Sequence, residues 1–132
     1  MRSRGIINAQ LSRVLSELRH TDLIVIADSG LPVAAGGPEV VDLAVVYGVP
    51  SFETVLRAVV DEIVVEAAAA ATEVTDANAA CWSLLRRVLD RNVELVPHED
   101  FKTRTMQARA VVRTGEATPY ANVLLRCGVP FA

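Results

Sequence analysis

The chain has 132 residues, close to the commonest length of one compact domain, and its 52% of apolar residues can fill one core. Its 13 basic and 16 acidic residues give a net charge of −3 without a basic block, and only 5% of residues are aromatic, so neither nucleic acid nor an anionic membrane is an expected partner. The longest apolar run, residues 63–71, is interrupted by Glu66 and is shorter than the ~20 residues of a membrane helix. The arginine-containing start lacks the apolar run of a secretory signal. These features predict a single cytoplasmic domain over residues 1–132.

The first expected elements are a helix, a strand, a loop and a second strand. Asn8 can cap a helix with apolar residues at helical spacing, which should end near His20. Residues 23–27 are wholly apolar and rich in β-branched side chains, which predicts a strand buried on both faces. The Gly- and Pro-rich residues 29–38 predict a loop, and residues 41–46 predict the second strand.

The second half of the chain continues this alternation. Ser51 is the expected cap of a helix that runs to about residue 60. Residues 63–72 are ambiguous, because consecutive alanines favour helix while Ile-Val-Val favours strand, and we expect a strand. The remaining elements are a helix over 77–90, a strand at 93–96, a helix from about His98 with Phe101, Thr105 and Ala108 inward, and strands at 111–113 and 122–126. The order predicts an α/β fold of three layers, with a mostly parallel sheet and helices on both faces.

Scarce titratable side chains mark the candidate site. The chain has two histidines and one lysine: His20 precedes Thr21-Asp22, while His98 and Lys102 are spaced i, i+4. Imidazole titrates near neutral pH and suits proton transfer. Asp28 follows a predicted strand directly, and ligands of open α/β sheets bind beyond the carboxyl ends of strands.

Several common kinds of site are absent from the sequence. It has no glycine-rich phosphate-binding motif, no nucleophile elbow and no His or Cys cluster with metal-ligand spacing. Cys81 and Cys127 lack CxxC spacing and are expected to be small buried residues. What remains is acid–base chemistry on an uncharged ligand, without metal or cofactor.

Five motifs, which follow one another along nearly the whole chain, closely resemble those of the D-ribose pyranases, a family that also includes the L-fucose mutarotases. They are His20-Thr21-Asp22, Asp28-Ser29-Gly30-Leu31-Pro32, Gly48-Val49-Pro50-Ser51-Phe52, His98-Glu99-Asp100-Phe101-Lys102 and Gly115-Glu116 to Tyr120-Ala121-Asn122. Gly30-Leu31-Pro32 and Tyr120-Ala121-Asn122 are similar to the ribose branch, whereas Arg19 and Ser29 stand where Gly and Ala are usual.

The resemblance implies an isomerase that interconverts β-D-ribopyranose and β-D-ribofuranose without cofactor or metal and supplies the furanose to ribokinase. It also implies a ring-shaped homo-oligomer with sites at subunit boundaries. In these sites His20 is the catalytic acid, while Asp28, His98, Tyr120 and Asn122 bind the sugar with Lys102 close by. Because His98 and Lys102 are distant in sequence from His20 and Asp28, we expect them to complete a neighbour's site.

Other interpretations of the same residues stay open at this stage. The protein could be a mutarotase for another sugar such as L-fucose, or a non-catalytic sugar-binding or assembly module associated with a ribose transporter. Taken singly, His20 could interact only with a helix dipole, and Asp28 could only end a strand in a turn. His98 and Lys102 could form a solvated helix face, and Tyr120 and Asn122 an ordinary turn.

Overall fold

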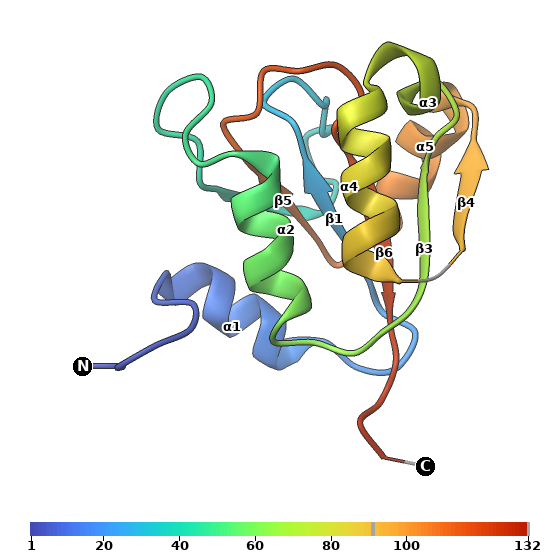
Figure 1. Ribbon diagram of the computed structural model, residues 1–132. Helices are drawn as coiled ribbons and strands as arrows, with labels where there is room; N and C mark the ends of the chain where they lie inside the picture. The colour runs from blue at the N-terminus through green and yellow to red at the C-terminus, as the bar shows by residue number, and fades with distance from the viewer. Residues whose placement is uncertain (91, 132) are drawn as a thin grey trace.

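Six strands and five helices make up the computed structural model, which describes residues 1–90 and 92–131 (Figure 1). In chain order they are α1 (Ala9–Glu17), β1 (Leu23–Ala27), β2 (Glu39–Asp42), α2 (Phe52–Val60), β3 (Val65–Ala71), α3 (Val74–Ala77), α4 (Ala79–Leu89), β4 (Val93–Val96), α5 (His98–Thr105), β5 (Ala110–Arg113) and β6 (Val123–Cys127).

The strands form one sheet in the order β2-β5-β1-β6-β3-β4. The pairs β2–β5, β5–β1 and β3–β4 are parallel, whereas β6 lies antiparallel between β1 and β3. The sheet is therefore mostly parallel, as the sequence predicts. The carboxyl ends of the parallel strands all lie along one edge of the sheet, and the carboxyl end of β6 lies along the opposite edge. The positions of the functional side chains follow from the edge at which their segments lie.

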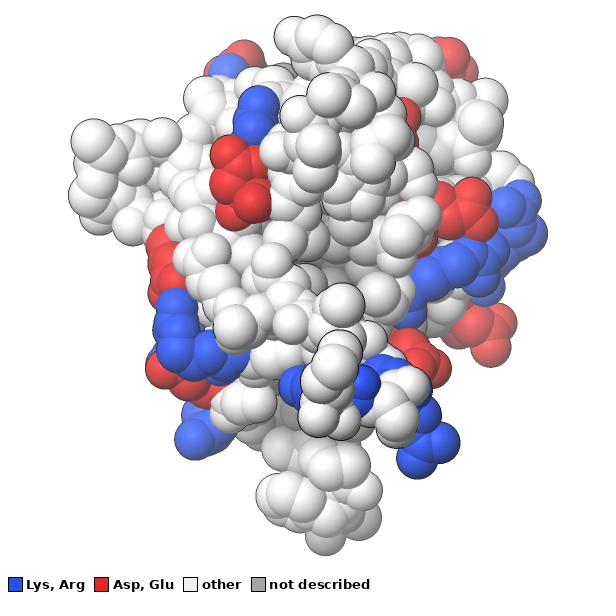
Figure 2. All heavy atoms as spheres, turned by 90° about the vertical axis from the view of Figure 1, so that its left-hand side faces the viewer, with Lys and Arg blue, Asp and Glu red and all other residues white. Residues whose placement is uncertain are grey.

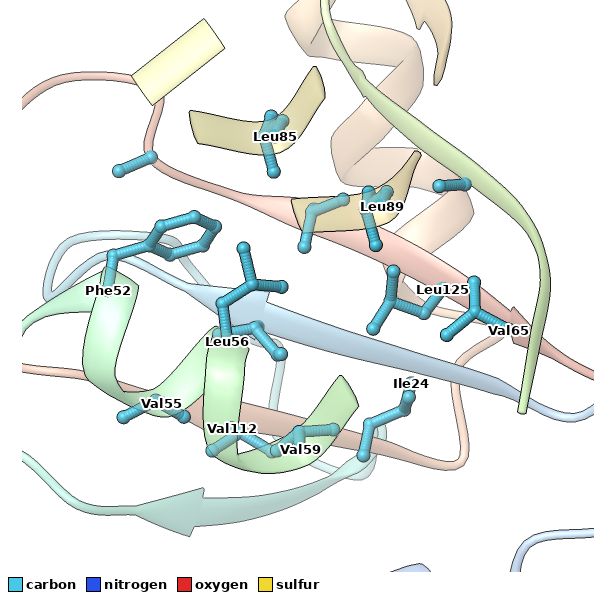
Figure 3. Close-up of a cluster of buried hydrophobic side chains, with 14 of the residues drawn as sticks. Ile24, Phe52, Val55, Leu56, Val59, Val65, Leu85, Leu89, Val112 and Leu125 are labelled. Carbon is cyan, nitrogen blue, oxygen red and sulfur yellow. The ribbon is translucent and has the colours of Figure 1, made fainter. Parts of the chain in front are cut away.

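One face of the sheet is covered by α1, α2 and α4 (Figure 1). The apolar side of α2 packs on strand residues such as Ile24 and Val112 and on Leu85 of α4 (Figure 3). A side-chain cap fixes where α2 begins, because Ser51 Oγ accepts a hydrogen bond from the Thr54 amide at 3.1 Å. This face forms the larger part of the core.

The other face is covered by α5 and the loop after β1. Phe101 is fully buried there beside Val111 and Leu124, and Thr105 and Ala108 are also buried, as predicted. Helices thus lie on both faces of the sheet. Because α5 begins at His98, the packing of Phe101 also fixes the position of that histidine.

Four predicted elements have other boundaries in the structure. The second strand is β2 and not residues 41–46, because the ladder with β5 pairs Glu39 with Ala110 and ends at Asp42, while Val45, Val46 and Tyr47 lie exposed in a loop. The helix expected over 77–90 is two helices, since Asn78 leaves helical geometry and its side chain caps α4. The last strand begins one residue later, because the backbone amide of Asn122 donates to the Tyr120 carbonyl and the ladder with β1 begins at Val123. The first helix ends at Glu17, before the expected position near His20.

The surface shows no tract of one charge on the face seen in Figure 2, where basic and acidic side chains lie next to one another. Arg13, for example, pairs with both Glu17 and Glu39. In the part of the chain that the structure describes, no helix is long and apolar enough to cross a membrane.

Candidate functional site

Asp28 and Asn122 form the centre of a polar cluster at the edge where the parallel strands end. The backbone amide of Asp28 donates to Asn122 Oδ1 at 2.8 Å, and Asn122 Nδ2 donates to Asp28 Oδ2 at 3.1 Å. Asp28 Oδ1 also accepts from the Gly30 amide at 2.9 Å, so the carboxylate does form the turn considered above. Asn122 is only 1% exposed. The Asn122 side-chain amide therefore holds the Asp28 carboxylate in one orientation beyond the carboxyl end of β1.

His98 and Tyr120 join this cluster from two other segments. Their rings meet edge to face, with centroids 5.0 Å apart and an interplanar angle of 83°. The Tyr120 carbonyl accepts from the Asn122 amide at 2.9 Å, which connects the rings to the pair at the centre. His98 Nδ1 is buried without a hydrogen-bond partner among the described residues. A buried ring nitrogen without a hydrogen-bond partner is unusual in a folded protein.

Glu73 fixes the start of α5 and hence the place of His98. Its carboxylate accepts from the His98 amide at 3.0 and 3.2 Å. Lys102 lies one turn further along α5, where its Nζ is 2.9 Å from Glu99 Oε1. Lys102 also lines a shallow pocket with Pro32, in the loop that follows Asp28. Lys102 thus faces the loop after β1, and its ammonium is paired with Glu99.

His20 lies at the opposite edge of the sheet from these residues. It precedes β1, whereas Asp28 follows β1, and the next residue, Thr21, donates its amide to the carbonyl of Cys127 at the end of β6. At about 3.3 Å per strand residue, His20 and Asp28 are separated by a distance on the order of 15 Å. The grouping of His20 with Asp28, which we inferred from distance in the sequence, is therefore wrong. Within one subunit Asp28 lies in the cluster with His98, and His20 lies apart from both.

The surroundings of His20 contain a partner that sequence analysis did not assign. His20 Nε2 is 3.0 Å from Glu66 Oε2, so a carboxylate faces the imidazole. The one signal for Glu66 in the sequence is that it interrupts an otherwise apolar run.

Of the three non-glycine residues with a positive φ in the described part of the chain, one is a candidate site residue and one directly follows another. Tyr120 has a φ of 56°, and Thr21, directly after His20, has a φ of 72°. Positive φ is costly for a bulky residue and especially for a β-branched one, so the surrounding structure must hold both. Such conformations concentrate at functional sites. The two parts of the candidate site thus share this feature.

Arg113 and Glu116 anchor the loop that carries Asp28 and were also missed. Arg113 Nε donates to the Ser29 carbonyl at 3.0 Å, and the Ser29 amide donates to the Glu116 carbonyl at 2.9 Å. The Glu116 carboxylate accepts from the Phe52 amide at 2.9 Å, which connects the loop to α2. Glu116 lies inside a quoted motif, whereas nothing in the sequence points to Arg113.

The described residues contain no group of three or more His, Cys, Asp or Glu side chains that could hold a metal ion. Neither cysteine is suited to nucleophilic work, because burial raises the pKa of Cys81 to about 12 and that of Cys127 to about 11.

An open α/β sheet with carboxylate, amide, imidazole and phenol groups beyond its strand ends defines a protein that binds a small polar ligand. Residues 1–130 match the model of the RbsD / FucU transport protein family, and the chain belongs to this family. It is 55% identical to D-ribose pyranase 1 of Rubrobacter xylanophilus, over 99% of this chain and 100% of that protein. It is 53% identical to D-ribose pyranase of Streptomyces coelicolor over the same shares.

Solved structures agree with the fold. The structure of Bacillus subtilis RbsD complexed with D-ribose matches with a TM-score of 0.94 at 42% identity, over 99% of this chain and 100% of that one. The fucose mutarotase of Streptococcus pneumoniae in complex with L-fucose matches with a TM-score of 0.81 at 24% identity, over 95% of each chain, and supports the fold alone.

Proposed function

We propose that the protein is a D-ribose pyranase, an isomerase that interconverts β-D-ribopyranose and β-D-ribofuranose. The observation that carries this proposal is the cluster of Asp28, Asn122, Tyr120 and His98 at the strand ends. It occurs in a chain 55% identical to a D-ribose pyranase over its full length. We further propose, as the family resemblance implies, that the reaction takes place in the cytoplasm and supplies its furanose product to ribokinase.

The reaction needs one group that both accepts and donates a proton. Opening the pyranose removes the proton of the anomeric hydroxyl, breaks the bond between C1 and the ring oxygen O5, and protonates O5 to give the open aldehyde. The O4 hydroxyl then attacks C1, loses its proton and returns one to O1, which closes the furanose. A neutral imidazole can take the first proton and deliver it to O5, and we assign this work to His20.

The cluster supplies the contacts that hold the sugar. A carboxylate offers about four acceptor positions, and the two internal hydrogen bonds of Asp28 leave about two for sugar hydroxyls. We assign the His98 imidazole to a further hydroxyl, because its ring meets that of Tyr120 within the cluster. The Tyr120 ring can cover the apolar face of the sugar, and Asn122 keeps Asp28 in place. We place Lys102 at the edge of the same site.

A complete site then requires two subunits, since His20 lies at the far edge of the sheet from the cluster within one chain. The ring-shaped homo-oligomer implied by the family resemblance would bring the two edges together. Val45, Val46, Tyr47 and Val49 support assembly, because they are 76%, 61%, 84% and 53% exposed on one loop. An apolar patch of this kind is typical of an interface.

Subunit mixing tests the shared site. Chains carrying His20→Ala and chains carrying His98→Ala are each expected to be inactive in ribose ring exchange. In mixed oligomers some sites receive both intact histidines, so exchange should return. Mixed oligomers that form by mass spectrometry yet show no exchange would mean that each site is built within one subunit. Parallel measurements with L-fucose decide the sugar preference.

A further inference from the structure

Glu66 links His20 to Arg126 through its two carboxylate oxygens. His20 Nε2 lies 3.0 Å from Oε2, and Arg126 Nε forms an ion pair with Oε1 at 3.0 Å. The side chain of Glu66 is 30% exposed and that of His20 is 54% exposed. The contact therefore lies at the surface, where an imidazole would be free to turn without a partner.

The fold directs the Glu66 side chain to this place. Pairing of β3 with β6 shifts register between Val65, which faces Cys127, and Ala67, which faces Arg126, so Glu66 is the extra residue of a β-bulge. Bulges re-aim a side chain and are frequent beside active sites. Gly128 leaves room for the Glu66 side chain beside β6, because a Cβ there would lie 3.3 Å from the Glu66 Cβ. The glutamate is thus held by the backbone as well as by its partners.

The ionisation of Glu66 decides which His20 nitrogen carries the proton. The hydrogen bond from His20, followed by the charges of His20 and Arg126, lowers the pKa of the Glu66 carboxyl below its ordinary value. A carboxylate at neutral pH can only accept a hydrogen bond, so His20 Nε2 must donate. In the neutral imidazole, Nδ1 is then the nitrogen with a free lone pair.

We propose that Glu66 is a positioning residue, held by the bulge and by Arg126, which fixes His20 as the Nε2–H tautomer and makes Nδ1 the atom that exchanges protons with the sugar. This inference rests on the proposed function, because it assigns a role within the same reaction. Glu66 does not touch the sugar; it acts through His20.

Selective labelling of histidine with ¹⁵N tests the tautomer in the unmodified protein. The chain has two histidines, so the spectrum of His20→Ala assigns the His20 signals. At a pH where His20 is neutral, we expect Nε2 in the protonated range and Nδ1 in the unprotonated range. In Glu66→Gln the amide can both donate and accept, so a second tautomer should appear. A wild-type His20 protonated at Nδ1 would overturn the inference whatever the variants do.

Kinetics of ribose exchange give the second test. Glu66→Gln should lower the rate at saturating ribose about 10- to 100-fold, as loss of an orienting partner typically does, and leave the half-saturating ribose concentration unchanged. Glu66→Asp, which keeps the charge, should recover part of the rate. Glu53→Gln is the matched control, because Glu53 also pairs with an arginine, Arg57, but on α2.

The outcomes separate this inference from the proposed function. A folded Glu66→Gln variant with the wild-type rate, an equal loss in Glu53→Gln, or a change confined to the half-saturating concentration would each overturn the role of Glu66. If the wild type itself does not accelerate exchange, the proposed function fails, and the ¹⁵N spectra still decide whether Glu66 fixes the tautomer.

Discussion

Replacing Asn122 by Asp tests the amide–carboxylate pair at the centre of the site. Asn122 is 1% exposed, and its Nδ2 lies 3.1 Å from Asp28 Oδ2. Asn122→Asp keeps the shape of the side chain but places a second carboxylate at about the same distance. Two like charges there repel by roughly 5 kcal/mol at an effective dielectric constant of about 20. The protein can avoid this repulsion only by taking up a proton.

The cost of protonating one of the two carboxyl groups sets how much Asn122→Asp lowers the free energy of unfolding. A carboxyl with the ordinary pKa of about 3.9 takes up a proton at pH 7 at a cost of about 4 kcal/mol, and the cost falls by about 1.4 kcal/mol per pH unit. The protonated group then donates its O–H and restores the hydrogen bond. We therefore expect Asn122→Asp to lower the free energy of unfolding by about 4 kcal/mol at pH 7 and about 1.5 kcal/mol at pH 5.

Urea unfolding at both pH values measures this difference, at one fixed protein concentration because the proposed association would contribute to stability. Asn8→Asp is the matched control. Asn8 Oδ1 accepts from the Leu11 amide at 2.9 Å as the cap of α1, and Asp caps a helix equally well. A loss in Asn122→Asp that does not depend on pH, or that is no larger than the loss in Asn8→Asp, would refute the reasoning.

Four further predictions concern catalysis, metals, thiols and acid stability. His20→Ala should lower the exchange rate by ~10²–10⁴-fold without changing the unfolding midpoint, because the side chain is 54% exposed; a folded variant with the wild-type rate would rule out the acid–base role. Dialysis against a chelator should leave exchange unchanged, since the described residues offer no metal-binding group, and a loss that zinc or manganese restores would refute this. A thiol reagent at neutral pH should leave Cys81 and Cys127 unmodified until the protein unfolds, because burial raises their pKa values to about 12 and about 11; rapid reaction of the native protein would contradict this. The hydrogen bond from Arg104 lowers the pKa of Glu94, so the ion pair stabilises the fold above the ordinary glutamate pKa of about 4.3 and ceases to do so at lower pH. The Tm difference between wild type and Glu94→Gln should therefore narrow below about pH 4. A difference that stays constant with pH would argue against the pair.

Local sequence patterns predicted an element correctly where burial and intrinsic propensity favour the same secondary structure. The run that forms β1 is apolar throughout because both faces of that strand are covered, and Ser51 caps α2 as its position predicts. The alanines of β3 show the opposite case, since helix propensity favours the wrong state there. They form a strand because β3 lies between β6 and β4, where Ala69 and Ala70 are buried against neighbouring elements.

Features that depend on distant pairing could not be predicted from local pattern. The position of β2 depends on its ladder with β5, and Val45 and Val46, which suggested a longer strand, are exposed instead. The grouping of the site depends on which sheet edge each segment reaches. His20 and Glu66 are separated by 46 residues and meet only because β1 and β3 both flank β6.

Saturation-transfer NMR on free D-ribose tests the central claim most directly. Irradiating a β-pyranose signal should reduce the β-furanose signal far more in the presence of catalytic amounts of the protein than in buffer, and His20→Ala should return the transfer to the buffer level. A protein that binds ribose, as shown by ligand contacts in the same spectra, but leaves the exchange at the buffer rate would contradict the account and define a sugar-binding module.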